Sequence, residues 1–403
     1  MSTTTSVPAP SVAPLSAVLP AEPTLLMGAG PVPIPKEVAR ANGIVINHLG
    51  PTMDAVVARV REMAAYVFQT RSDRIFGLAA PASGAMEMAV ANVCWPGRKV
   101  LSLTTGTFSA RLAEMASNVG ADVIRIESGD VRQPVGAEQV RRELARHKID
   151  VVTMVHGETS CGVKTVELSE ICRLAKSHGA LTIVDAVVTL SAMPMPMDEW
   201  AIDVCFTAGQ KALSSIPGVS LCAFSRDAWR VVEAHPAPRP HWCYDAVRAQ
   251  KFWGEHQYHY TAPTSGILAL HEALRLVTEE TLERRFARHE FCSTAMQAGL
   301  EAMGLELFIP ERVRLDSVLA VGVPAGVDSA RVRDRMTTQF GVEISGAFGL
   351  DIVRIGQMGE QCRPAHLLRT LEALGRSVVA EGVPLDVDAG MATLARKLAA
   401  TNV

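Results

Sequence analysis

Lys211 is the residue in this sequence best suited to covalent chemistry. It lies in the segment Asp203–Gly218, where an apolar run is followed by small residues, Gln210, the lysine and a Pro-Gly turn. Lysine is scarce, since only eight of the 39 basic residues are lysines. Burial lowers the pKa of an ammonium group, and the neutral amine is a nucleophile that forms a Schiff base with an aldehyde. The alternative, for this lysine taken alone, is a strand-end side chain that reaches solvent.

Asp185 ends the apolar run 181–184. Aspartates are seldom buried unless a positive charge or several hydrogen-bond donors face them. A protonated ring nitrogen of a cofactor would be such a partner, and Asp185 would keep it protonated. The alternative is a helix N-cap or an ordinary turn residue.

Two turns of small residues each precede a helical pattern. In the first, Ser83, Gly84 and Ala85 follow a strand pattern. Backbone N–H groups at a helix N-terminus, together with a serine hydroxyl, form a site for a phosphate. The second turn, Thr105–Phe108, ends in an aromatic side chain that can stack on a planar ring. Each motif is weak alone, because Ser83 also fits an N-cap and Phe108 a core position.

Short apolar runs alternate with amphipathic stretches of helical length, which predicts βαβ units. We expect an α/β fold with a mostly parallel central sheet that is covered by helices on both faces. The expected strands are 75–79, 99–103, 122–126, 150–155, 181–184, 204–207 and 219–224. The expected helices are 53–68, 84–93, 109–119, 137–147, 168–178 and 227–234. Ligands of such folds bind at the carboxyl ends of the strands.

The chain divides at a long helical region that runs from about Thr264 to Met303. The expected strands after it lie near 317–321, 342–344 and 353–355, and the expected helices near 329–339 and 365–380. We expect a disordered leader (1–24), a large domain (25–275), a smaller C-terminal α+β domain (276–385) and a helical or frayed tail (386–403).

Composition excludes several classes of protein. With 48% hydrophobic and 20% charged residues the chain is globular, and a formal charge of −3 without basic runs argues against nucleic-acid binding. No apolar run reaches the length of a membrane span, and the first 24 residues lack the basic start of a secretory signal. Eight cysteines without zinc-ligand spacing indicate reduced thiols in a cytoplasm and no metal site.

The order of these motifs resembles the class V, fold-type I aminotransferases that depend on pyridoxal 5'-phosphate (PLP), most closely the alanine–glyoxylate and serine–glyoxylate group. Further segments match this family over roughly residues 25–380. They are Leu25-Leu-Met-Gly-Ala-Gly-Pro31, His156-Gly-Glu-Thr-Ser-Cys-Gly-Val163, Gly209-Gln-Lys-Ala-Leu213, Tyr258-His-Tyr-Thr-Ala-Pro263 and Arg354-Ile-Gly-Gln-Met-Gly359. The motifs are specific in combination.

The resemblance implies a role for each matching residue. Lys211 would form the Schiff base with PLP, Asp185 would pair with the pyridine nitrogen, and Arg354 would bind the substrate α-carboxylate. The remaining cofactor contacts implied by the resemblance are Ser83, Gly84, Ala85 and Gln210 at the phosphate, Phe108 on the ring face, and Thr159 near the phenolic oxygen. Tyr258 and Thr261 match residues that reach the phosphate of the neighbouring subunit, which implies a homodimer with shared active sites.

The sequence therefore predicts a cytoplasmic PLP-dependent transaminase that moves an amino group from a small amino acid of the alanine, serine or glycine type to a 2-oxo acid such as glyoxylate or pyruvate. The run Asn47–Pro51 lacks the arginine and serine that the family often has there, which favours a substrate with few polar groups. A lyase, an amine or aminophosphonate aminotransferase and a pyridoxamine–pyruvate type aminotransferase are the alternatives on the same fold. A non-catalytic binding protein is the alternative from another class.

Overall fold

A seven-stranded sheet forms the centre of the larger part of the molecule in the computed structural model, which describes residues 7–400. Its strand order is β2-β10-β9-β8-β5-β3-β4. The strands are β2 (Ile75–Leu78), β3 (Lys99–Thr104), β4 (Asp122–Glu127), β5 (Val151–Val155), β8 (Leu181–Asp185), β9 (Val204–Ala208) and β10 (Ser220–Phe224). Only β10 runs antiparallel to its neighbours, so the prediction of a mostly parallel sheet is confirmed.

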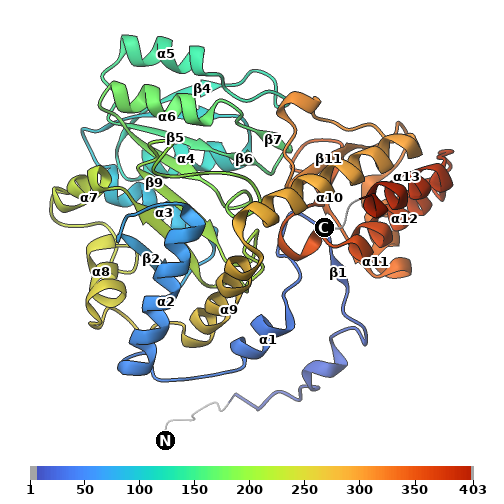
Figure 1. Ribbon diagram of the computed structural model, residues 1–403, viewed down its shortest axis with the longest axis horizontal. Coiled ribbons are helices and arrows are strands. Elements are labelled where there is room, and N and C mark those ends of the chain that lie inside the picture. The colour runs from blue at the N-terminus through green and yellow to red at the C-terminus, as the bar shows by residue number, and fades with distance from the viewer. Residues whose placement is uncertain (1–6, 401–403) are drawn as a thin grey trace, which may run out of the picture.

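Helices cover this sheet, as Figure 1 shows. They are α2 (Pro51–Phe68), α3 (Ala82–Val93), α4 (Thr107–Asn118), α5 (Ala137–Arg146), α6 (Leu168–Ser177), α7 (Arg226–Glu233) and α8 (Ala246–Glu255), while α1 (Lys36–Asn42) packs against the helix Thr264–Glu280. Three of them, α2, α3 and α4, begin two residues earlier than the sequence pattern predicted. As a result, Ser83 lies in the first turn of α3 and Phe108 in the first turn of α4.

A smaller unit lies beside the large sheet and is built on β11 (Val318–Gly322), β14 (Ile352–Gly356) and β13 (Ser345–Gly346) in an antiparallel sheet. The helices of this unit are α11 (Ser329–Phe340), α12 (Pro364–Val379) and α13 (Val387–Ala399). Near the N-terminus, β1 (Leu25–Leu26) pairs with β12 (Val342–Glu343). Leu25 and Met27 pack in the apolar core of the smaller unit, so this short segment is anchored there.

Two long helices, α9 (Thr264–Glu280) and α10 (Leu282–Met303), connect the two parts (Figure 1). Leu282 at the start of α10 packs in the core of the large sheet, whereas Met296 and Leu300 pack in the core of the smaller unit. The tail helix α13 packs against α10 and α12. The short elements are β6 (Gly157–Glu158), β7 (Val163–Lys164) and the 3-10 turns η1 (Leu15–Ala17), η2 (Glu311–Val313) and η3 (Gly359–Gln361).

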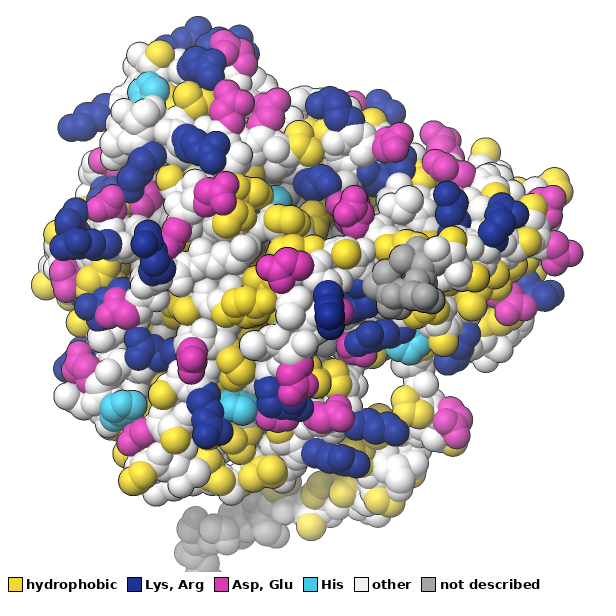
Figure 2. Space-filling model, viewed as in Figure 1, with side chains coloured by type: hydrophobic (Ala, Val, Ile, Leu, Met, Phe, Trp, Pro, Cys, Tyr) yellow, Lys and Arg dark blue, Asp and Glu magenta, His cyan; other side chains and the backbone are white. Residues whose placement is uncertain are grey.

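Residues 7–22 of the expected leader are exposed and contain only the short turn η1, while residues 1–6 lie outside the described part of the chain. No described helix is long and apolar enough to cross a membrane. Figure 2 shows basic and acidic side chains interspersed on the viewed face, in keeping with the near-neutral net charge.

Candidate active site

Five of the predicted residues line one pocket at the carboxyl ends of the parallel strands. They are Ser83, Phe108, Thr159, Asp185 and Lys211. Each follows or ends a different strand, because the alternation of strands and helices returns the chain to the same edge of the sheet. The pocket therefore brings together residues that are far apart in the sequence, from a helix N-terminus to a turn after β9.

The Lys211 side chain is half-buried, and its amine donates a hydrogen bond of 2.5 Å to the main-chain oxygen of Ala29. Burial, with a smaller contribution from the charge of Arg354, lowers the pKa of Lys211 to about 8. The side chain crosses Gly30, where an added Cβ would lie 2.6 Å from Lys211 Cδ and where φ is +94°. This close approach explains why the segment before Pro31 carries a glycine. A substantial fraction of the folded protein thus holds a neutral amine near pH 8.

Asp185 is the second charged group of the pocket and is 6% exposed. One carboxylate oxygen accepts a hydrogen bond of 2.8 Å from the backbone N–H of Val187. Burial raises the pKa of Asp185 to about 7, although that hydrogen bond and the charge of Lys211 oppose the shift. Among the described residues Asp185 forms no ion pair. A buried carboxylate with so few stabilising partners is suited to pair with a cationic ring nitrogen. Such a partner would lower the pKa of Asp185 toward its ordinary value.

The first turn of α3 contributes the anion-binding end of the pocket. Ser83 lies at its N-terminus, and Gly84 and Ala85 are buried directly after it. The backbone N–H groups of such a turn are available to an anion. Gln210, next to Lys211, is also buried, and its Oε1 has no hydrogen-bond partner among the described residues. Its free oxygen is an acceptor, so any contact of Gln210 with a phosphate would use the amide N–H groups.

Arg111 also lines this pocket and is absent from the residues that the sequence motifs pointed to. Its Nη1 donates a hydrogen bond of 3.3 Å to the Ser83 hydroxyl, and its guanidinium lies 5.1 Å from the centre of the Phe108 ring. The signal that could have found it is its position three residues after Phe108, since residues i and i+3 share a helix face. Arg111 gives the serine turn a positive charge that suits a phosphate.

A buried carboxylate, Glu158, holds the turn that carries Phe108. It accepts hydrogen bonds from the backbone N–H groups of Phe108 and Ser109, at 3.2 and 2.9 Å, and from the hydroxyls of Ser109 and Ser160. Glu158 therefore caps α4 from another strand and fixes the aromatic ring at the pocket wall.

Arg354 reaches the site from β14 of the smaller unit and is 6% exposed. Its Nε donates to the main-chain oxygen of Gly346, and its Nη1 to that of Thr159, both at 2.8 Å. Among the described residues Nη2 has no protein partner. The guanidinium is thus oriented by two carbonyls while one nitrogen stays free for an anionic ligand.

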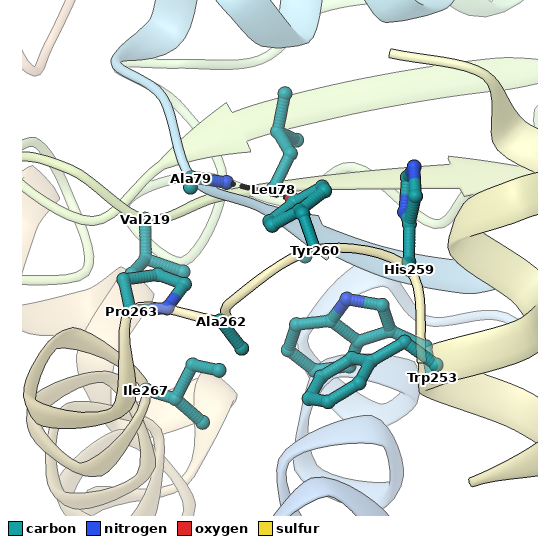
Figure 3. Close-up of a pocket in the computed structure, with 11 residues that line it drawn as sticks. Leu78, Ala79, Val219, Trp253, His259, Tyr260, Ala262, Pro263 and Ile267 are labelled. Carbon is teal, nitrogen blue, oxygen red and sulfur yellow. Dashed lines mark hydrogen bonds between the residues drawn. The ribbon is translucent and has the colours of Figure 1, made fainter. Parts of the chain in front are cut away.

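A second, small apolar cavity lies between β2, α8 and α9, behind the segment that leads to Ser83 (Figure 3). The Tyr260 hydroxyl accepts a hydrogen bond of 3.1 Å from Ala79 N–H (Figure 3). Outside that view, the Ser220 hydroxyl donates a hydrogen bond of 2.9 Å to the Ala80 oxygen. The cavity measures about 10 Å³, the space of about one water, so it holds no cofactor or substrate. These contacts hold the chain just before Ser83.

Tyr258 and Thr261 are not brought into the pocket of their own chain. Both are exposed, and Tyr258 is 60% exposed with its ring 5.9 Å from that of His48. Among the described residues, no group of three histidine, cysteine or acidic side chains is arranged to hold a metal ion. All eight cysteines are free thiols.

Comparison with known proteins gives the family. The model of the family "Aminotransferase class-V" matches residues 35–373. The chain belongs to the class-V aminotransferases. It is a transaminase, and the fold and family expected from the sequence motifs are confirmed.

Among relatives of this class-V aminotransferase, (S)-ureidoglycine–glyoxylate transaminase of Bacillus subtilis is 33% identical over 374 residues, which are 87% of this chain and 89% of that protein. Alanine–glyoxylate aminotransferase of Mus musculus is 30% identical over 362 residues, 87% of this chain and 86% of that protein. The crystal structure of the Bacillus subtilis enzyme superposes with a TM-score of 0.92 at 31% identity, covering 94% of this chain and 99% of that one. Pyridoxamine–pyruvate aminotransferase from Mesorhizobium loti has a TM-score of 0.89 at 28% identity, with coverages of 94% and 98%.

Proposed function

We propose that this transaminase uses PLP to move an amino group from a small amino acid to a short 2-oxo acid such as glyoxylate or pyruvate. The observation that carries the proposal is the placement of Lys211 and Asp185 in one pocket with Arg354 at its edge. PLP fits the residues present, because Asp185 is a buried carboxylate without a cationic partner among the described residues. Ser83 lies beside Arg111 at a helix N-terminus, which suits the phosphate of PLP.

PLP supplies, when bound, an aldehyde that accepts amino groups and a protonated pyridine ring that withdraws electrons. Asp185 would hold a proton on the ring nitrogen, and Phe108 would stack on the ring. Ser83, Gly84, Ala85, Gln210 and Arg111 would hold the phosphate, and Thr159 the phenolic oxygen. Lys211 would attach the aldehyde covalently and, once displaced by substrate, take a proton from the substrate Cα and deliver it to the cofactor carbon that carried the aldehyde. A pKa near 8 suits both tasks, because the amine can be neutral or protonated at working pH.

Arg354 would bind the α-carboxylate of the substrate. With the carboxylate fixed at Arg354 and the nitrogen fixed beside Lys211, the Cα–H bond can be held perpendicular to the ring plane. The exposed ring of Phe348 lies 5.8 Å from the Arg354 guanidinium, so the surroundings of the arginine offer little to a second carboxylate. This supports small donors such as alanine, serine or glycine. The glyoxylate acceptor is supported by the names of the Bacillus subtilis and mouse relatives.

The test is a spectroscopic half-reaction. Purified protein, loaded with PLP, is treated with alanine, serine, glycine and (S)-ureidoglycine in turn. The absorbance of the bound chromophore and the ammonia released are both measured. A transaminase should convert the chromophore to the pyridoxamine form and release no ammonia. Borohydride reduction followed by peptide mapping should place the cofactor on Lys211. Lys211→Ala should abolish the fixed chromophore, whereas Lys148→Ala, at an exposed lysine, should retain it. A chromophore that is still fixed to the Lys211→Ala chain would overturn the assignment.

We also propose a homodimer in which Tyr258 and Thr261 complete the partner's phosphate site, which their exposure in one chain supports. Chains carrying Lys211→Ala and chains carrying Tyr258→Ala with Thr261→Ala would each be impaired. Mixed dimers would contain one intact site, so activity should return on mixing and refolding. Failure of complementation in a proven mixed dimer would contradict shared sites.

We also propose a cytoplasmic location and a division into a large domain (25–275), a small domain (276–385), a leader and a tail, with the segment from Leu25 to Met27 packed on the small domain. Eight free thiols, seven of them buried, support a reducing compartment. Fractionation of cells that express the protein tests the location.

A further inference from the structure

A buried ionic cluster at the end of α9 and the start of α10 lies outside the pocket but contacts the backbone beside Lys211 and the segment that follows Arg354. It consists of Glu280, Arg285, Arg288 and His289. Arg285 and Arg288 are 3% and 7% exposed, and both pair with Glu280. Two arginines with one shared carboxylate are costly to bury, so the cluster needs the further hydrogen bonds that it makes.

Arg285 fixes the backbone directly after the reactive lysine. Its Nη2 donates a hydrogen bond of 2.7 Å to the oxygen of Ala212, and its Nε one of 3.3 Å to the Ser191 hydroxyl. The Ser191 hydroxyl itself donates to the same Ala212 oxygen at 3.1 Å. The turn that carries Lys211 is thus held by a planar guanidinium with two donors in a fixed geometry.

Arg288, one turn further along α10, fixes the segment that follows Arg354. Its Nη1 donates to the oxygens of Gly359 and Cys362, at 3.0 and 2.9 Å. This segment leaves β14 only a few residues after Arg354. The same helix therefore holds the backbone next to the amine and the backbone next to the carboxylate-binding arginine.

His289 and Ser214 also bond to the segment at Gly359 and Glu360, and so join it to α10 and to the turn that carries Lys211. His289 Nε2 accepts a hydrogen bond of 2.8 Å from Gly359 N–H, so its Nδ1 carries the proton and donates to the Arg285 oxygen at 2.6 Å. Burial, and then the two arginines, lower the pKa of His289 well below its usual value, in agreement with a neutral ring. The Ser214 hydroxyl, in the lysine turn, accepts a hydrogen bond of 2.9 Å from Glu360 N–H. Gly359, at φ +57°, leaves no room for a side chain beside Ser214.

We propose that Arg285 and Arg288 are positioning residues that set the separation between the Lys211 amine and the Arg354 guanidinium. The Lys211 amine must reach the substrate Cα while Arg354 holds the carboxylate, so this separation decides whether Cα of a bound substrate lies within reach of the amine. A misplacement of about 1 Å can cost on the order of 100-fold in rate. The inference rests on the proposed function for its kinetic consequence, but its structural part concerns the chain alone.

The experiment compares Arg285→Met and Arg288→Met with Arg284→Met, which removes an exposed arginine from the same helix. In PLP-free protein, the pH dependence of Lys211 labelling by a small amine reagent gives the pKa of the amine. Arg285→Met should raise that pKa by about one unit, because a loosened turn exposes the amine to water. It should also lower kcat by about 10- to 100-fold. Arg288→Met should act mainly on KM for the amino donor. Arg284→Met should change none of these.

If Arg285→Met does not fold, Arg285→Lys replaces it, since lysine keeps the charge and one donor but loses the two-point hold. Variants that lose thermal stability but keep the wild-type amine pKa and the wild-type kcat and KM would overturn the inference and leave a structural role only. Failure of the proposed function can be told apart from failure of the positioning role of Arg285 and Arg288. In that case wild-type protein would hold no lysine-linked chromophore, while the amine pKa of PLP-free protein would still report on the position of Lys211.

Discussion

Arg354 donates a hydrogen bond of 2.8 Å to the main-chain oxygen of Thr159, a residue that lines the pocket of Lys211. The two residues are 195 positions apart and lie in different parts of the fold. Their contact therefore joins the smaller unit to the edge of the central sheet at the place where substrate is proposed to bind. The guanidinium is oriented before any ligand arrives, which reduces the entropy lost on binding a carboxylate.

Replacement of Arg354 by lysine should weaken binding of the amino donor more than it slows the chemical step. Lysine keeps a positive charge but cannot bond two carbonyls and a carboxylate in one plane. Loss of a charge-assisted hydrogen bond of about 1.5–3 kcal/mol predicts a rise in KM of about 10- to 150-fold. Steady-state kinetics with alanine check this, with Arg369→Lys, an exposed arginine, as the control. An unchanged KM would contradict a role in carboxylate binding.

Replacement of Asp185 by asparagine should stabilise the PLP-free protein while it weakens function. Folding raises the pKa of Asp185 to about 7, so the native state binds the proton more tightly and wild-type stability falls as pH rises from about 4 to 7. Three units at 1.36 kcal/mol each make the full cost about 4 kcal/mol above pH 7. Denaturant unfolding at pH 5 and pH 8 should show that the asparagine variant gains more at pH 8. The exposed Asp334→Asn should show no such difference.

Lys211 should react with aldehydes at a lower pH than an ordinary lysine. Its pKa of about 8 in the folded protein lies below the value near 10.4 of an exposed amine. Attachment of PLP to the PLP-free protein, followed from pH 6 to pH 10 with borohydride trapping, should therefore rise with a midpoint near 8. A midpoint near 10 would show that the amine is not buried as described.

Replacement of Gly30 by alanine should displace the Lys211 side chain. The added Cβ would lie 2.6 Å from Lys211 Cδ, and the φ of +94° is unfavourable for alanine. We expect a lower melting temperature and a loss of covalently bound PLP. Gly43→Ala is the matched control, because Gly43 has an ordinary φ of −79° and a nearest neighbour at 3.4 Å. Full retention of PLP by Gly30→Ala would refute the close approach.

Replacement of Arg111 by methionine should weaken binding of PLP but not of pyridoxal, which lacks the phosphate. The loss of a charge beside Ser83 predicts a fall in PLP affinity of about 10-fold or more. Equilibrium titration of PLP-free protein with both compounds measures the difference. Arg125→Met, at an exposed position on β4, should bind both like the wild type. Equal weakening for both compounds would point to a role in ring packing instead.

The sequence by itself determined the succession of elements and the residues that end them. Apolar runs of strand length, separated by helical periodicity, predict the parallel sheet because both signals are local. The same local order places Asp185 and Lys211 at strand ends, so their convergence on one edge follows from the topology of βαβ units. The family resemblance added Arg354, which no local pattern singles out.

Only the tertiary structure decided which other groups act on these residues. Arg111 and Glu158 contact residues of the pocket wall, and Arg285 contacts the backbone beside Lys211, through bonds between segments that are separated along the chain. The N-terminal strand β1 joins the smaller unit by pairing with β12, more than 300 residues away. Such contacts are fixed by packing and by the need to pair buried charges, which depend on the whole fold and not on the neighbouring residues.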